Sequence, residues 1–509
     1  MTADRRVGTV TLDPGHHRGT IDRRLFGSFV EHMGRCVYTG IHEPGHPAAD
    51  AYGFRSDVAA LVAELGVTLV RYPGGNFVSG YDWRDGIGPA DRRPRRLDTA
   101  WRSVETNQVG TDEFLGWAER GGLQPMMAVN LGTAGITEAA ALVEYCNTPG
   151  GTYWSDLRAA NGRREPYGVP LWCLGNEMDG PWQTGHMSAA EYGRIAAESG
   201  KAMKLVDPGI EVVVCGSSNH GMPTFGYWES TVLERAWDVA DYVSMHAYYQ
   251  EHDGDRRSFL ASGAAMDRFI DDVVATVDAV AARKHSRKRL SISFDEWNVW
   301  YWERFAGSES LTLDVSGPRI EDVYSALDAV VVGDLLMSLV NHSDRVRVAC
   351  QAQLVNVIAP IMTRPGGEAW RQAIFGPIAA TAALARGNSL VARVRGGELS
   401  TARHDDVPLL AAAATHDEAS GTAAVFLTNR AAEAIDVVLD HRAFGSWGEV
   451  SAVCLAAGAE GPLHGGRAVA RHAALAPLAV TADGAGTTRL TLPPESWAAV
   501  TAGSAAGSR

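Results

Sequence analysis

The feature that most constrains the fold is a regular alternation of short apolar runs with helical segments between about residue 25 and residue 385. Continuous apolar runs of this length are typical of strands that are buried on both faces of a parallel sheet. Asp, Ser or Thr stands near the start of the helical segments, as helix N-termini prefer. Eight strands that alternate with helices predict a (β/α)8 TIM barrel. A doubly wound open sheet is the competing fold, but no GxGxxG motif follows the first strand.

The expected barrel elements can be given by their residue ranges. The predicted strands are Leu25–Glu31, Val67–Tyr72, Gln124–Asn130, Val169–Asn176, Glu211–Gly216, Tyr242–Tyr248, Leu290–Glu296 and Val346–Gln351. The predicted helices include Ser56–Leu65, Thr111–Arg120, Ser188–Val206, Ala264–Lys284 and Glu321–Val340.

A second domain is expected because 509 residues exceed what one hydrophobic core normally supports. After about residue 386 short alternating runs appear between Gly, Pro, Asp and His, which predicts a jelly-roll-like all-β sandwich. We divide the chain into a strand segment at 1–20 that joins the sandwich, the barrel at 21–385, the sandwich at 386–502 and a disordered tail at 503–509. The predicted sandwich strands are Leu409–Ala414, Ala423–Leu427, Ile435–Leu439, Val450–Cys454, Thr488–Leu492 and Trp497–Ala502.

Composition and charge exclude several classes of protein. The formal net charge of −14 argues against nucleic acid as a partner. The six cysteines form no CxxC motif, so neither a disulfide framework nor a zinc site is expected. The N-terminus has no apolar signal core, and no segment approaches membrane-spanning length. We therefore expect a cytoplasmic protein with no membrane partner.

Unusual polar residues collect where the predicted strands end. In TIM barrels the C-terminal ends of the strands meet at one face, and that face carries the active site. Such a coincidence at six or seven strands is hard to attribute to chance. The residues are Glu31 and His32 after strand 1, Arg71 and Asn76 after strand 2, Asn130 after strand 3, Asn176 and Glu177 after strand 4, His246 and Tyr248 on strand 6, Asp295, Glu296 and Asn298 on strand 7, and Gln351 and Gln353 after strand 8.

Glu177 and Glu296 are the most informative pair among these residues. Each ends a strongly apolar strand and lies close to an asparagine, and a carboxylate there is costly unless it faces a wet cleft or has partners. Cleavage of a glycosidic bond needs one carboxylic acid to protonate the leaving oxygen and a second carboxylate to attack the anomeric carbon or to activate water. We expect Glu177 to be the acid, because a partly apolar pocket with Trp172 and Trp182 favours its protonated form. Glu296, held by Arg71 or Tyr248, is the expected nucleophile.

Other readings of single residues stay open at this point. Glu31 could be a buried ion-pair partner of Arg71 or Arg35 instead of a sugar ligand. Asp295 is better explained as a residue that supports its neighbours than as a catalyst. His246 alone would more often be a satisfied core histidine, but its place at a strand end favours a site role.

Several long motifs resemble those of the α-L-arabinofuranosidases of glycoside hydrolase family 51. The resemblance covers the whole barrel and, more weakly, the flanking β-domain. The matching stretches are Phe26–Arg35, Ile41–Pro47, Arg71–Tyr81, Trp101–Asn107, Leu174–Gln183, Phe294–Tyr301 and Ala352–Pro360.

The resemblance implies a retaining double displacement by an exo-acting enzyme on arabinan or arabinoxylan oligosaccharides. It places the acid/base at Glu177 and the nucleophile at Glu296, and it implies no metal and no cofactor. It also implies a homo-oligomer, a hexamer in many members. The implied sugar-binding residues are Glu31, Asn76, Asn176, His246, Tyr248 and Gln353, with Trp101 and Trp300 at the entrance.

Two departures from the family pattern and three rival functions remain. The segment Glu303–Pro318 is atypically rich in Ser and Gly, and Gln351 is the fallback for Gln353. The nearest rival is a related barrel hydrolase with endoglucanase or β-xylosidase activity. A sugar-binding protein without activity and a metal-dependent barrel lyase or isomerase are more distant, because both glutamates are intact and no clustered ligand set is evident.

Overall fold

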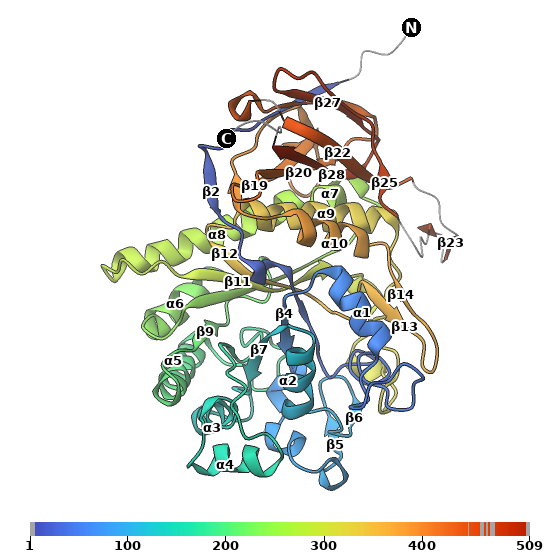
Figure 1. Cartoon of the computed structure of the whole chain (residues 1–509). Helices are drawn as coiled ribbons and strands as arrows, with labels where there is room; N and C mark the ends of the chain where they lie inside the picture. The colour runs from blue at the N-terminus through green and yellow to red at the C-terminus, as the bar shows by residue number, and fades with distance from the viewer. Residues whose placement is uncertain (1–5, 446, 459–462, 465–466, 469–473, 505–509) are drawn as a thin grey trace.

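The structure is a computed structural model that describes residues 6–445, 447–458, 463–464, 467–468 and 474–504. Eight parallel strands close into a barrel, and a sheet-rich domain lies at one end of it (Figure 1). The predicted fold class is therefore confirmed. The barrel strands are β3 (Gly27–Phe29), β4 (Leu69–Tyr72), β7 (Gln124–Val129), β8 (Leu171–Leu174), β9 (Glu211–Val214), β10 (Tyr242–Tyr249), β11 (Ser291–Val299) and β12 (Val346–Gln351).

The barrel strands are apolar on both faces because both faces are covered. Side chains that point inward, among them Leu171 and Cys173 of β8, form a compact core inside the barrel. Their neighbours Trp172 and Leu174 point outward and belong to the larger core between strands and helices. A strand buried on both sides therefore needs no polar alternation, which is why it reads as a continuous apolar run.

The surrounding helices begin and end at recognisable signals. Gly66 ends α1 in the left-handed conformation at φ 79°, and Ser188 and Glu191 form a capping box at the start of α5. The helix predicted at Glu321–Val340 begins later, because Ser325 caps it. The helices are α1 (Ser56–Leu65), α2 (Thr111–Arg120), α3 (Ile136–Asn147), α4 (Tyr153–Ala160), α5 (Ala189–Val206), α6 (Tyr227–Ala236), α7 (Arg256–Leu260), α8 (Ser262–Arg283), α9 (Ala326–Asn341) and α10 (Phe375–Leu384).

The two largest sheets of the β-domain each contain a strand from the start of the chain. β1 pairs with β21 and β16, and β2 pairs with β15. β28 continues through Gly503 and Ser504, so these two residues of the expected tail are ordered as strand, while 505–509 lie outside the described residues. The first sheet is β16 (Arg393–Arg395), β1 (Val7–Thr11), β21 (Ile435–Asp440), β27 (Thr487–Leu492) and β26 (Val480–Ala482). The second is β2 (His17–Thr20), β15 (Asn388–Leu390), β19 (Leu410–Asp417), β20 (Thr422–Asn429), β28 (Ser496–Ser504), β22 (Trp447–Ala456) and β25 (Ala476–Pro477).

Helix α9 joins the two domains and is buried along residues 326–340 because it packs on the barrel side and on the β-domain. Gly333 lies against the indole of Trp497, where a Cβ atom would come within 2.4 Å of the ring. The next residue, Asp334, accepts hydrogen bonds from Arg430 of the β-domain, with Oδ2 at 2.7 Å from one terminal nitrogen. Both side chains are almost completely buried.

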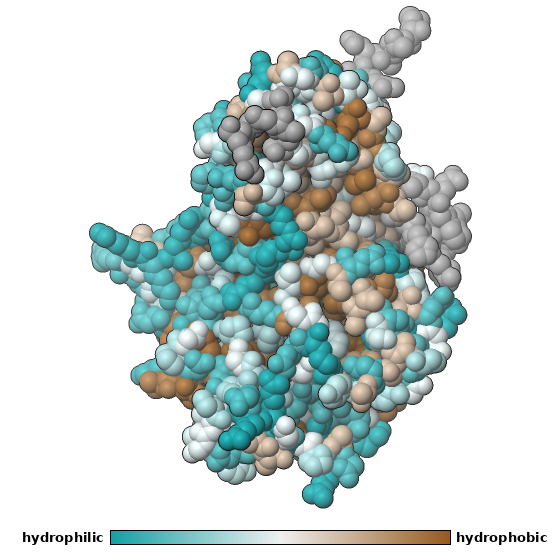
Figure 2. All heavy atoms as spheres, viewed as in Figure 1, coloured by the Kyte–Doolittle hydropathy of each residue, from teal (hydrophilic) through white to brown (hydrophobic). Residues whose placement is uncertain are grey.

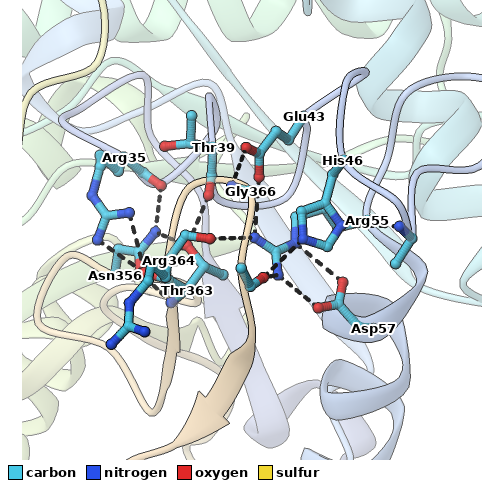
Figure 3. A network of polar contacts seen from close by, with 12 residues as sticks. Arg35, Thr39, Glu43, His46, Arg55, Asp57, Asn356, Thr363, Arg364 and Gly366 are labelled. Atoms are coloured by element: carbon cyan, nitrogen blue, oxygen red, sulfur yellow. Dashed lines mark hydrogen bonds and ion pairs between the residues drawn. The ribbon is translucent and has the colours of Figure 1, made fainter.

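A polar network anchors the chain around the barrel mouth (Figure 3). Arg55 is completely buried and pairs with Asp57 and Glu43. Its remaining hydrogen bonds go to the carbonyls of Arg364 and Gly367, in the hairpin between β13 (Ile361–Thr363) and β14 (Ala369–Arg371). All three nitrogens of the guanidinium therefore donate hydrogen bonds, as burial of a charge requires.

The same network fixes the segment that follows β12. Asn356 donates through Nδ2 to the carbonyl of Arg35 and to Oγ1 of Thr363. Arg35 in turn pairs with Glu321. These bonds hold the loop that carries Gln353 against the loop that follows β3, and so position two parts of the barrel mouth relative to each other.

Hydrophilic residues cover much of the barrel surface in the view of Figure 2, and apolar surface gathers mainly toward the β-domain. Within the described ranges, no helix is both long enough and apolar enough to cross a membrane.

Candidate active site

The C-terminal ends of the barrel strands bring the predicted residues to one mouth. β4 supplies Arg71, β10 supplies His246 and Tyr248, and β11 supplies Asp295 and Glu296. Glu31, Glu177 and Gln353 lie in the turns that follow β3, β8 and β12. Residues separated by more than 300 positions in the chain are therefore in direct contact, as the bond between Gln353 and Glu31 shows.

Glu296 is buried and held from two sides. One terminal nitrogen of Arg71 donates to its Oε1 at 2.7 Å, and the hydroxyl of Tyr248 donates to its Oε2 at 2.7 Å. The other terminal nitrogen of Arg71 donates to Oδ1 of Asn176 at 2.6 Å. Charge-assisted bonds of this kind are short and fix the orientation of the carboxylate.

Asp295 completes the charge balance behind Glu296. Its Oδ2 lies 3.6 Å from Nε of Arg71, and its Oδ1 lies 3.2 Å from Nε2 of His246. Burial alone would favour the neutral acid, but the neighbouring Arg71 charge holds the pKa of Asp295 below its usual value. Asp295 therefore supports both a cation and an imidazole ring, in agreement with the interpretation that it supports its neighbours.

Glu177 lies on a bent turn directly after β8. Gly175 adopts φ 84° and Glu177 itself adopts φ 45°, a left-handed conformation that costs energy for a residue with a Cβ atom. Its two carboxylate oxygens are each hydrogen-bonded: Oε1 to Nδ1 of His246 at 2.9 Å and Oε2 to Nε1 of Trp182 at 2.7 Å. The turn thus aims the carboxylate at the mouth.

His246 bridges Glu177 and Asp295 through its two ring nitrogens. Burial disfavours the charged ring, but the surrounding carboxylates of Glu296, Asp295 and Glu177 outweigh burial and raise the pKa of His246 to about 10. The ring of His246 therefore favours its charged form between the carboxylates of Glu177 and Asp295.

The two glutamates are close enough for a double displacement. One carboxylate oxygen of Glu177, one ring nitrogen of His246 and one carboxylate oxygen of Glu296 all lie within 4.8 Å of one another. Carboxyl groups about 5–5.5 Å apart are typical of retaining glycosidases, and about 6.5–9.5 Å of inverting ones. The same three atoms could in principle bind a cation, but Arg71 is 2.7 Å from Glu296 and places a positive charge there already.

Glu31 forms the other side of the pocket. Its Oε1 accepts from the backbone N–H of Phe77 at 3.0 Å and from Nε1 of Trp101 at 2.8 Å, and its Oε2 accepts from Nε2 of Gln353 at 3.1 Å. Burial raises the pKa of Glu31 to about 8.

The ion-pair interpretation of Glu31 is not observed, because other acids occupy both proposed partners. Arg71 pairs with Glu296 and Arg35 pairs with Glu321. The assignment of Gln353 over Gln351 agrees with the contacts, since Gln351 Nε2 donates to the carbonyl of Ile358 instead of reaching Glu31.

Several buried polar atoms around this pocket have no protein partner. They include Nδ2 of Asn176, Oε1 of Gln353 and Nε1 of Trp300. Buried polar atoms are normally hydrogen-bonded. Such atoms at the mouth of a barrel can bond to the hydroxyl groups of a sugar.

The remaining predicted residues surround the mouth. Asn76 begins the short helix η2 (Asn76–Gly80) directly after Gly75. Gly75 has no room for a side chain without crowding, because a Cβ atom would lie 3.3 Å from oxygens of Glu31 and of Glu296. Trp300 packs edge-on against Tyr248, with ring centroids 5.1 Å apart. In the atypical segment Glu303–Pro318, the carbonyl of Asp314 accepts from the backbone N–H of Val104, beside Trp101.

The sequence analysis expected Trp172 and Trp182 as apolar neighbours of Glu177. Trp172 is not a neighbour, and Trp182 contacts Glu177 through a hydrogen bond. Trp172 was expected beside Glu177, but its side chain points outward into the core and donates to the carbonyl of Val169. Trp182 instead bonds directly to Glu177. The Gly180–Pro181 pair before it is the signal that could have indicated a chain reversal toward the carboxylate.

Comparison with known proteins gives a consistent result. Two family models match: the α-L-arabinofuranosidase 1 domain over residues 61–272 and the α-L-arabinofuranosidase C-terminal domain over residues 295–496. An intracellular exo-α-(1→5)-L-arabinofuranosidase of Streptomyces lividans is 56% identical over 84% of this chain. The match spans 64% of that relative, which is less than two thirds of its length.

Two further matches cover both proteins almost completely. An exo-α-(1→6)-L-arabinofuranosidase of Bifidobacterium longum is 52% identical over 96% of each chain. Among solved structures, a family 51 α-L-arabinofuranosidase from Bifidobacterium longum superposes with a TM-score of 0.90 at 42% identity, covering 99% of this chain and 100% of that one.

Proposed function

The chain belongs to the α-L-arabinofuranosidases of glycoside hydrolase family 51, and we propose that it is an exo-acting enzyme that removes terminal α-L-arabinofuranosyl residues with retention of configuration. The observation that carries the proposal is the pair Glu177 and Glu296, whose nearest ligand atoms lie within 4.8 Å. The alternative of endoglucanase or β-xylosidase activity is not favoured by these relatives.

In the first step Glu296 is the nucleophile. Its carboxylate oxygen attacks the anomeric carbon, the glycosidic C–O bond breaks, and Glu177 transfers a proton to the departing oxygen. Arg71 and Tyr248 hold the carboxylate of Glu296 in its orientation for this attack. The product of the step is a glycosyl ester on Glu296 and a free alcohol.

In the second step Glu177 acts as a base. It removes a proton from water, the water oxygen attacks the anomeric carbon, and the ester bond to Glu296 breaks. His246 assists both steps by holding Oε1 of Glu177 in place. Two inversions at one carbon leave the configuration retained.

We assign the sugar pocket to Glu31, Asn76, Asn176, Tyr248 and Gln353. Asn176 is held through its carbonyl oxygen by Arg71, which leaves its Nδ2 free to donate to the 2-hydroxyl. A bond to that hydroxyl strengthens as the transition state gains oxocarbenium character. We assign Trp101, which is bonded to Glu31, and Trp300 to the entrance, where they would close the short pocket that an exo-acting enzyme requires.

The substrates that fit are arabinofuranose-containing oligosaccharides. The relatives are named for α-(1→5) and α-(1→6) linkages, so either linkage is a candidate here. We further propose a cytoplasmic location, supported by the word intracellular in the name of the Streptomyces lividans relative. The hexamer, and the absence of a metal or cofactor, remain predictions from the family resemblance.

The experiment that tests this proposal is azide rescue of hydrolysis of 4-nitrophenyl α-L-arabinofuranoside. We expect Glu296→Ala to be nearly inactive and azide to give the inverted glycosyl azide. We expect Glu177→Ala to release 4-nitrophenol readily in the first step, to turn over slowly without azide, and to give the retained azide when azide is added. Asp272→Ala, an exposed acid on α8 bonded to His220, is the matched control. Wild-type activity on xylosides or glucans alone would contradict the substrate assignment, and unchanged activity in both variants would contradict the carboxylate pair.

A further inference from the structure

Trp182 lies in an unusual position for a half-exposed tryptophan. Its side chain is bonded through Nε1–H to Oε2 of Glu177 at 2.7 Å, although 49% of the residue remains exposed to solvent. A Trp N–H usually finds a hydrogen-bond partner when it is buried, and here it does so on a residue that is half exposed. The indole therefore reaches one oxygen of the acid/base from the solvent side.

The backbone next to Trp182 is shaped to seat the ring. A Cβ atom on Gly180 would come within 2.5 Å of Cε2 and 2.9 Å of Nε1 of the indole. Gly180 does not adopt a left-handed φ, so its lack of a side chain is explained by this close approach and not by backbone conformation. The turn is closed by the backbone bond from the Gly180 N–H to the Glu177 carbonyl at 2.8 Å.

The two oxygens of Glu177 have different neighbours. Oε1 faces the imidazole of His246, and Oε2 faces the indole N–H of Trp182. An N–H donor stabilises the ionised carboxylate and disfavours the protonated one. Because His246 occupies Oε1, a proton destined for the departing glycosidic oxygen would be carried by Oε2, and the indole must yield that oxygen when the substrate arrives.

We propose that Trp182 is a positioning residue that holds Oε2 of Glu177 in its ionised form and thereby sets the upper pH limit of the acid step. This inference rests on the acid/base role proposed above for Glu177. It adds a residue whose contribution is made through the carboxylate and not through contact with the reacting atoms. The close contact between Gly180 and the indole ring contributes to the same positioning.

The other charged groups near Glu177 are unchanged by substitution of Trp182. They come from three elements and from the loop itself. The groups are His246 on β10, Asp295 and Glu296 on β11, Arg71 on β4 and Asp179 in the loop after β8. If the pH dependence of kcat/KM changes when the indole N–H is removed, the change therefore results from loss of the hydrogen bond between Trp182 and Glu177.

The test is the pH dependence of kcat/KM on an arabino-oligosaccharide for wild type, Trp182→Phe and Gly180→Ala. Trp182→Phe keeps an aromatic ring but removes the donor, and Gly180→Ala keeps the donor but displaces the ring. In both variants we expect the basic limb to move to higher pH by roughly half a unit or more. Trp302→Phe is the matched control, because Trp302 is 48% exposed and its ring packs near His252.

Two results would overturn the inference. The first is a variant, Trp182→Phe or Gly180→Ala, that has the circular dichroism spectrum of the wild type but a kcat/KM lowered by the same factor at every pH. The role of Trp182 would then be only structural. If Trp302→Phe moves the limb equally, the effect is not specific to the bond with Glu177. The wild-type enzyme, assayed alongside on 4-nitrophenyl α-L-arabinofuranoside, tests the proposed function separately, because an active wild type with an unmoved limb in the variants contradicts only the role of Trp182.

Discussion

Burial of Glu31 in the site should lower the free energy of unfolding of the protein at neutral pH. Its carboxyl group is completely enclosed, and burial raises its pKa from an ordinary value near 4.5 to about 8. The folded protein therefore binds this proton more tightly than the unfolded chain. The contribution of Glu31 to folding is fully present below pH 4.5 and is lost as the pH rises toward 8. At neutral pH the unfolded chain gains by ionising Glu31 and the folded protein does not.

The size of the effect follows from the pKa difference. Between pH 5 and pH 7.5 the wild-type protein should lose about 3 kcal/mol of unfolding free energy through this group, at about 1.36 kcal/mol per pH unit. Glu31→Gln removes the titration but keeps the shape of the side chain. Its amide nitrogen would face Nε2 of Gln353, another donor, which adds a cost that is the same at both pH values.

The assay is chemical denaturation of wild type and Glu31→Gln at pH 5 and pH 7.5. We expect the variant to gain about 3 kcal/mol relative to wild type between the two conditions, whatever its absolute stability. Glu165→Gln serves as a control that should show no such gain, because Glu165 is exposed; its backbone carbonyl, which the substitution leaves intact, accepts from Arg163. An equal stability difference at both pH values would mean that Glu31 is ionised in the folded protein, and the reasoning from burial would be refuted.

Two further predictions concern the domain interface and the nucleophile. Arg430→Met should lower the unfolding free energy by about 3–5 kcal/mol, because Asp334 is left buried without its partner; calorimetry checks this, and a fall below about 1 kcal/mol would contradict it. Asp334→Leu combined with Arg430→Met should recover most of the loss. Tyr248→Phe should lower kcat about ten- to a hundredfold with a smaller change in KM, because Oε2 of Glu296 loses a charge-assisted bond; steady-state kinetics that show only a raised KM would assign Tyr248 to binding alone.

The barrel could be predicted from the sequence because burial on both faces leaves a visible pattern. Strands such as β8, with four consecutive buried residues, have no polar interruption until the chain leaves the barrel at Asn176 and Glu177. The position of the glutamates therefore followed from where apolar runs stop. The start of α9 could not be predicted in this way. The four residues Glu321–Tyr324 continue the helical pattern of the sequence, but Ser325 caps the helix and it begins at Ala326.

What the sequence could not show was which way side chains face in a fully buried strand. Trp172 and Cys173 are both buried, but one lies in the outer core and the other inside the barrel, and no polar alternation distinguishes them. The contact between Trp182 and Glu177 depends on the turn geometry around Gly180, which has no periodic signature. The raised pKa of Glu31 depends on how completely the loops enclose it, which is a property of the assembled mouth.

The most direct test of the account is to trap the glycosyl ester on Glu296. Glu177→Ala should form the ester quickly from 4-nitrophenyl α-L-arabinofuranoside and hydrolyse it slowly, because the base for the second step is missing. Acid quenching and peptide mass spectrometry should then find one anhydropentose on the peptide that contains Glu296. A burst of 4-nitrophenol with the modification on another residue, or single-step release of arabinose with inverted configuration, would contradict the double displacement.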